Sequence, residues 1–180
     1  MERSRRPLAA ARLASAAESL LSASSLCAIA TISPGNRAHV NTAYFAWNPE
    51  WDLVWLSDPE ARHSRHIRAK STVAIAVYDS SQSWGNLDRG IQLFGAAREL
   101  EGATAQKAAA LYASRFPTYG QEELAYRFYR FRPRRLKLFD EPALGAGVFV
   151  TARVAPRGRL VWERTDLYPA ADSGTRRARA

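Results

Sequence analysis

The sequence has little cysteine, and it lacks the long apolar runs, internal repeats and glycine-rich loops that mark several common protein classes. Its single cysteine, Cys27, has no partner for a disulfide within the chain, which is typical of proteins in a reducing cytoplasm. No run approaches the ~20 apolar residues of a membrane-spanning helix, and no glycine-rich nucleotide loop is present. We therefore expect a cytoplasmic protein without a membrane span.

The charge is strongly basic but divided along the chain. The 180 residues include 26 Lys and Arg against 17 Asp and Glu, a net charge of +9, which makes nucleic acid a candidate partner. However, much of the excess lies at the two ends, in residues 3–6 and 176–179. We expect a disordered basic arm over 1–7, one domain over 8–169 and a disordered basic tail over 170–180, and we do not expect nucleic acid to be a specific partner.

Alternating apolar residues and turn signals predict mostly β structure. Helices are expected over 8–23, 60–69 and 104–116, the last capped by Thr104 and ended by Pro117. Strands are expected over 26–33, 37–46, 51–56, 73–78, 91–100, 134–139 and 145–154, with a further apolar segment over 158–169 and a loop over 80–88. The sequence of the segment 124–131 is compatible with a helix at the beginning of that segment. This pattern favours an α+β fold built on a small antiparallel barrel with helices on its rim.

Residues 55–95 contain a pattern suited to binding phosphate. A strand ends in Ser57-Asp58-Pro59 and is followed by a basic helix that begins with Arg62 and His63. Unpaired amides at a helix start favour an anion, and an Arg guanidinium matches phosphate oxygens. Ser57 adds a hydroxyl, whereas a neutral His63 would help less than lysine. The alternative interpretation is a solvated helix face.

Three motifs together resemble the pyridoxamine 5′-phosphate oxidase family of FMN-binding split barrels. They are the hairpin over 27–42, Ala61-Arg62-His63 with Ile67, and a later group made of Trp84, Leu87, Arg89, Gly90, Ile91 and Gly95. The resemblance covers about residues 20–140 and implies a six-stranded antiparallel split β-barrel with peripheral helices. It also implies an FMN-dependent oxidoreductase acting on a small molecule, and a homodimer with the cofactor at the subunit interface.

The resemblance also implies a set of cofactor-binding residues, in which the backbone of residues 41–44 faces the flavin ring. The set is Asn41, Thr42, Ala43, Tyr44, Leu56, Ser57, Arg62, His63, Trp84, Arg89 and Gln92. For Thr42 and Tyr44 the alternative is plain strand alternation. The aromatic residues after position 127 suit either a dimer interface or ordinary core packing.

Three positions depart from the family pattern. His63 replaces a phosphate-binding Lys, Gly90 replaces a flavin-contacting Gln, and Asn41 stands where pyridoxamine oxidases carry an Arg. These departures imply a relative that does not oxidise pyridoxamine phosphate. A deazaflavin reductase, a non-catalytic flavin- or haem-binding protein and a cofactor-free enzyme remain alternatives.

No other chemical site is expected from the residues. His63 and His66, three positions apart, could share a metal ion, but no third ligand has suitable spacing, so we expect no metal. No motif for Ser-His-Asp or Cys-His catalysis is present, and no catalytic residue is assigned.

Overall fold

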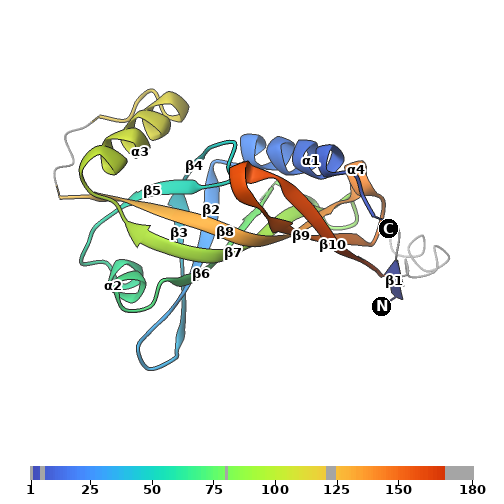
Figure 1. The fold of residues 1–180 in the computed structure, drawn as a ribbon, viewed down its shortest axis with the longest axis horizontal. Coiled ribbons are helices and arrows are strands. Elements are labelled where there is room, and N and C mark those ends of the chain that lie inside the picture. Colours follow the sequence, from blue (N-terminus) through green and yellow to red (C-terminus); the bar gives the residue numbers. More distant parts are fainter. Residues whose placement is uncertain (1, 5–6, 80, 121–124, 169–180) are drawn as a thin grey trace.

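The computed structural model describes residues 2–4, 7–79, 81–120 and 125–168 (Figure 1). The helices are α1 (Ala10–Ala23), α2 (Arg62–Ala69), α3 (Gly102–Arg115) and α4 (Glu141–Leu144), with a 3-10 turn, η1 (Pro156–Gly158). The strands are β1 (Glu2–Ser4), β2 (Leu26–Ile32), β3 (Ala38–Tyr44), β4 (Ala46–Trp47), β5 (Leu53–Ser57), β6 (Thr72–Tyr78), β7 (Arg89–Glu99), β8 (Arg127–Asp140), β9 (Val148–Val154) and β10 (Leu160–Leu167).

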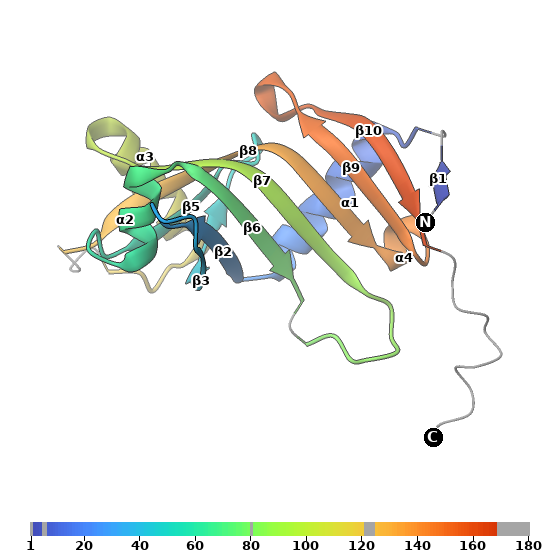
Figure 2. The same ribbon diagram turned by 90° about the horizontal axis from the view of Figure 1, so that it is seen from below.

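The ten strands of the described residues belong to one antiparallel sheet. Eight follow the order β1-β10-β9-β8-β7-β6-β2-β3, whereas β4 pairs with β5 and β5 pairs with β8. The long strand β8 divides this sheet, because it pairs with β5 through Arg127–Phe131 and with β9 through Arg135–Phe139 while β7 runs along its other edge. Figure 2 shows β6 to β10 side by side, with α2 at one end of the sheet. The predicted mostly β, antiparallel split-barrel fold with peripheral helices is confirmed, with more strands than the six expected.

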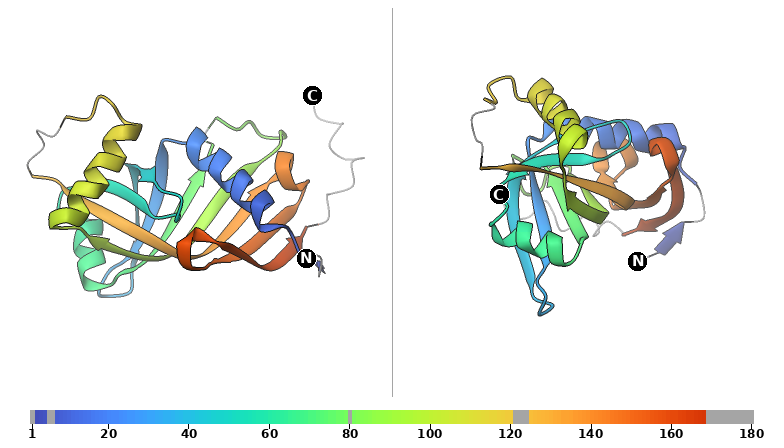
Figure 3. Two further views of the ribbon diagram at one scale, coloured as in Figure 1. Left: turned by 45° about the horizontal axis from the view of Figure 1, so that its top comes forward. Right: turned by 60° about the vertical axis from the view of Figure 1, so that its left-hand side comes forward.

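Two apolar clusters hold the sheet and helices together. Helix α1, expected over 8–23, lies across the sheet (Figure 3) and buries Leu13, Ala17, Leu20 and Leu21 against it, as is typical of an amphipathic helix. Cys27 lies in this core, where burial raises the pKa of its thiol to about 12 and leaves it unreactive. A smaller cluster joins α3 to β4, β5 and the start of β8.

The structure corrects three local expectations. The described part of 124–131 contains no helix, because β8 is one 14-residue strand that passes through Pro133 at a bulge. Thr104 does not cap α3, because its hydroxyl donates a hydrogen bond to the carbonyl oxygen of Glu101. The helix begins earlier than expected, at Gly102, and no side chain caps it. In the N-terminal arm expected to be disordered, Glu2–Ser4 pairs with β10; Met1, Arg5, Arg6 and the tail lie outside the described residues.

Within the described ranges, no helix is both long and apolar enough to cross a bilayer.

Candidate functional site

A pocket of about 590 Å³ lies between β3, the end of β5 and helix α3, and we call it the β3–α3 pocket. It is lined by Asn41, Thr42, Ala43, Tyr44, Leu56, Ser57, His63, Tyr112, Phe116, Thr118, Tyr119, Gly120 and Tyr126. The first seven of these residues were predicted from the sequence, and the fold brings them together from three separate segments. The volume lies within the range of small-molecule and cofactor sites.

Strand β3 forms one wall and is the last strand of the sheet. It pairs only with β2 among the described strands, so the backbone N–H and C=O groups on its other edge have no strand partner. The side chains alternate, with Thr42 and Tyr44 exposed and Asn41 and Ala43 half-buried. This wall therefore offers backbone hydrogen-bonding groups to a bound molecule.

Asn41 carries an unsatisfied acceptor in this wall. Its side-chain Oδ1 is buried and has no hydrogen-bond partner, while Nδ2 makes only a long contact of 3.5 Å with the Thr42 carbonyl oxygen. Buried polar atoms are normally hydrogen-bonded, so an unpaired acceptor lining a pocket fits a ligand that donates a hydrogen bond.

Ser57 and His63 form a polar contact on the opposite wall. Ser57 ends β5, and its Oγ lies 2.6 Å from Nε2 of His63 in the first turn of α2. Burial, with smaller effects from His39 and His66, lowers the pKa of His63, so its imidazole is neutral near pH 7. The contact thus joins a hydroxyl to a neutral ring and leaves no fixed positive charge there.

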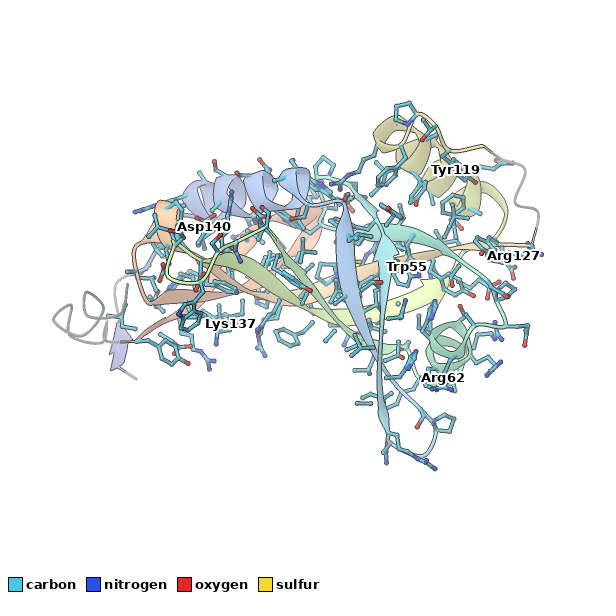
Figure 4. All side chains as sticks on the ribbon, turned by 180° about the vertical axis from the view of Figure 1, so that it is seen from behind. Trp55, Arg62, Tyr119, Arg127, Lys137 and Asp140 are labelled. Carbon is cyan, nitrogen blue, oxygen red and sulfur yellow. The ribbon has the colours of Figure 1, made fainter. Side chains whose placement is uncertain are left out.

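The start of α2 lies beside the Ser57–His63 contact and offers backbone N–H groups to an anion. No side chain caps it, and the Arg65 amide is bonded to the carbonyl of Ala61, the N-cap residue. The preceding amides of the helix thus lack intrahelical partners. Arg62, labelled in Figure 4, is exposed at this start, and it is not among the residues that line the pocket.

Aromatic side chains from α3 and the segment after it form the third wall, which the sequence analysis missed. The Tyr112 ring lies 4.7 Å from that of Phe116 and 5.3 Å from that of Tyr119, and Tyr44 meets Phe116 edge-on at 5.8 Å. The i, i+4 spacing of Tyr112 and Phe116 was the available signal, but it is equally typical of a core-facing helix. No lysine or arginine is among the described residues that line the pocket.

The other predicted residues lie away from this pocket. Trp84 is fully exposed in the β6–β7 loop, and Gln92 is exposed on β7. The Nη2 of Arg89 lies 2.9 Å from Oδ2 of Asp140, which Figure 4 places at the opposite end of the molecule from Tyr119. One copy of the chain therefore does not assemble all the predicted residues into one site.

No group of three His, Cys, Asp or Glu side chains in the described part of the chain is arranged to hold a metal ion.

Solved structures share this fold at low sequence identity. A haem-binding protein from Mycobacterium smegmatis is 18% identical with a TM-score of 0.65, over 83% of this chain and 60% of its own length. HutZ, a haem storage protein from Vibrio cholerae, is 17% identical with a TM-score of 0.57, over 69% of this chain and 91% of its own. An F420 reductase is 22% identical with a TM-score of 0.52, over 66% of this chain and 94% of its own. The chain thus spans less than two thirds of the mycobacterial protein.

Sequence comparison identifies the family. No curated protein sequence matches the chain. The family model described as pyridoxamine 5′-phosphate oxidase matches residues 13–140, which is more than half of the chain and includes β3, the end of β5, α2 and α3. The chain belongs to the pyridoxamine 5′-phosphate oxidase family.

Proposed function

We propose that this protein is an FMN-dependent oxidoreductase that binds the flavin in the β3–α3 pocket and acts on a small molecule. The observation that carries the proposal is the unpaired, buried Oδ1 of Asn41 beside the open backbone edge of β3. The flavin ring imide and the ribityl hydroxyls are donors suited to that acceptor. The flavin, when bound, supplies the capacity to accept and release electrons.

The FMN phosphate is assigned to the start of α2. Arg62, the Ser57 hydroxyl and the unpaired amides of the first helical turn provide donors to an anion. Because His63 is held neutral, Arg62 is the charged side chain in this set. The backbone of Asn41, Thr42, Ala43 and Tyr44 is assigned to the ring, where its N–H groups would stabilise negative charge.

The pocket favours a neutral substrate. Its aromatic wall offers stacking surfaces, and its described lining provides no cation that would pair with a substrate phosphate. A phosphorylated substrate would therefore lose its hydration without a compensating charge. We expect flat, uncharged molecules to be reduced or oxidised in preference to phosphorylated ones.

A homodimer would complete the site from two subunits. The outer sheet face carries small side chains at Ala28, Ala30, Ala74 and Ala76, and Phe94 is exposed beside them. We place a two-fold axis across this face, so that the face packs against its counterpart in the second copy, and we assign the β6–β7 loop of one copy to the pocket of the other. This arrangement accounts for the separation of Trp84 and Arg89 from the rest of the predicted set.

Mixing variant chains tests the shared site. Chains with Trp84→Ala and chains with Arg62→Ala should each bind FMN weakly, and mixed dimers should recover one intact site. Recovery would be measured as FMN bound per dimer after unfolding and refolding the two chains together. No recovery in mixed samples that sedimentation shows to be dimeric, or a wild-type protein that sediments as a monomer, would contradict the shared site but leave FMN binding by one subunit open.

A haem-binding protein is the second candidate, because His63 presents a neutral imidazole to the pocket and four tyrosines also line it. Neutral histidine and tyrosine are both axial ligands of haem iron. A deazaflavin reductase is the third, and the F420 reductase shares the fold.

The visible spectrum of the freshly purified protein distinguishes the cofactors, because FMN, deazaflavin and haem absorb at different wavelengths. FMN should then be titrated into cofactor-free protein while flavin fluorescence is followed. A colourless protein that leaves FMN fluorescence unchanged would refute the proposed cofactor, and a haem spectrum would favour the second candidate. With bound FMN, reduction by a nicotinamide donor followed by reoxidation tests for an enzyme.

A further inference from the structure

A second cleft, of about 500 Å³, lies between β8 and the turn that joins β9 to β10, and we call it the arginine cleft. It is lined by Glu50, Ala96, Arg132, Pro133, Arg134, Val154, Ala155, Pro156, Arg157 and Gly158. Five of these residues are alanine, valine or proline, and three are arginine. The cleft shares no lining residue with the β3–α3 pocket.

A strand irregularity shapes one side of this cleft. The pairing of β7 with β8 shifts between Phe94 and Gly95, and Gly95 faces Pro133. A Cβ atom at Gly95 would overlap the Arg132 carbonyl oxygen, so the two backbones approach more closely than a side chain allows. Arg132 and Arg134, on either side of Pro133, are both exposed in the cleft.

A turn in the left-handed backbone region forms the other side. Arg157 has φ 60° and ψ 30°, which is unfavourable for a residue other than glycine, and Gly158 follows with φ 72°. The turn is fixed because the Trp51 indole Nε1 donates to the Gly158 carbonyl oxygen at 2.7 Å. Arg157 is thus held beside the cleft by a rigid support.

The positive charges in the cleft are only partly compensated. Nε and Nη2 of Arg132 each lie 3.0 Å from an oxygen of buried Asp52, and Arg130 approaches the same carboxylate at 3.7 Å. Glu50 adds a negative charge to the lining. Within the described ranges, the guanidinium groups of Arg134 and Arg157 make no hydrogen bond or ion pair.

We propose that the arginine cleft binds a soluble phosphate monoester with an apolar body. Guanidinium groups match phosphate oxygens with paired N–H donors, and a dianion between Arg134 and Arg157 would offset their charges. The alanine, valine and proline side chains suit the apolar part of the ligand, and the concave shape suits a small molecule. The site does not depend on the cofactor proposed for the β3–α3 pocket.

Phenyl phosphate is a simple probe for this cleft, to be titrated into the protein as purified by calorimetry at low ionic strength. The Arg134→Ala/Arg157→Ala double variant should bind phenyl phosphate at least about tenfold more weakly, because two charge-assisted contacts are lost. The control is Arg153→Ala/Arg159→Ala, which removes the same charge from exposed arginines outside the cleft and should retain wild-type affinity. Inorganic phosphate should bind more weakly than phenyl phosphate.

Three results would overturn the proposal. They are no binding of phenyl phosphate to the wild-type protein, equal losses in the two double variants, and binding only to heparin or to vesicles containing phosphatidic acid. Thermal unfolding of both variants shows whether a loss of binding reflects a loss of folding.

Discussion

Replacing Asn41 with alanine should stabilise the cofactor-free protein against unfolding and weaken its affinity for FMN. The Oδ1 of Asn41 is buried without a hydrogen-bond partner, and its Nδ2 makes only a 3.5 Å contact. The substitution therefore removes a desolvated acceptor and little favourable bonding. In the FMN complex, the same acceptor is expected to receive a hydrogen bond, so its removal has the opposite sign.

The two effects can be bounded. A buried unsatisfied polar group costs about 1–3 kcal/mol, and because Asn41 is only half-buried, we expect a gain in unfolding free energy near the lower figure, about 1 kcal/mol. A neutral hydrogen bond contributes about 0.5–1.5 kcal/mol, so FMN should dissociate with a Kd roughly two- to tenfold higher.

Urea unfolding of the cofactor-free protein and fluorescence titration with FMN measure the two quantities separately. Gln106→Ala is the control, because Gln106 is an exposed amide side chain on α3 that does not line the pocket, and its replacement should change neither value by more than about 0.5 kcal/mol. Reduced stability of Asn41→Ala together with unchanged FMN affinity would refute the role assigned to this side chain.

Three further variants test other parts of the proposal. Arg62→Ala should weaken FMN binding by about 1.5–3 kcal/mol, the scale of a hydrogen bond to a charged group; an unchanged Kd, or an equal loss in the neighbouring Arg65→Ala, would remove Arg62 from the phosphate site. Burial, with smaller effects from His39, Arg62 and Arg65, lowers the pKa of His66. As the pH falls, His66 is therefore protonated at a higher pH in the unfolded chain than in the folded protein. The free energy of unfolding should decrease as the pH falls below about 6.5. His66→Gln should flatten this dependence in urea unfolding between about pH 5 and 8, and an unchanged slope would exclude His66 as its source. Trp84→Ala should shift the protein toward monomer in sedimentation while Ser83→Ala does not, since Trp84 is a fully exposed aromatic side chain; identical dimerisation of the two variants would exclude Trp84 from the interface.

Strand patterns predicted the elements around the pocket well, because they follow local rules. The strands expected over 26–33 and 37–46 form the β2–β3 hairpin, and Asn36 in the turn between them adopts a left-handed conformation. Gly95 belongs to the family motif, and the pairing of β7 with β8 shifts at this residue, where the two backbones approach closely. The helical start suggested for 124–131 failed because pairing with β5 and β7 overrides the local propensity of that segment.

The candidate site was harder to predict, because its walls meet only in the folded chain. Asn41, Ser57 and His63 came from a motif, and the fold places them in one pocket. Tyr112, Phe116 and Tyr119 were missed, since their spacing does not distinguish a core face from a pocket wall. Trp84 and Arg89 lie elsewhere because proximity in a sequence motif does not require proximity within one subunit.

The three departures from the family pattern have a common physical consequence. The ring of Phe139 covers Gly90, so a Gln there would have to displace it. His63 is bonded to Ser57 and held neutral, and Asn41 presents an acceptor where a relative would present a cation. Relative to the family pattern, each change places a shorter side chain at its position: His for Lys, Gly for Gln and Asn for Arg. Of these three positions, Asn41 and His63 line the β3–α3 pocket, which is suited to hydrogen bonding and aromatic contact, and the Arg62→Ala variant tests whether an anionic cofactor binds at the edge of this pocket.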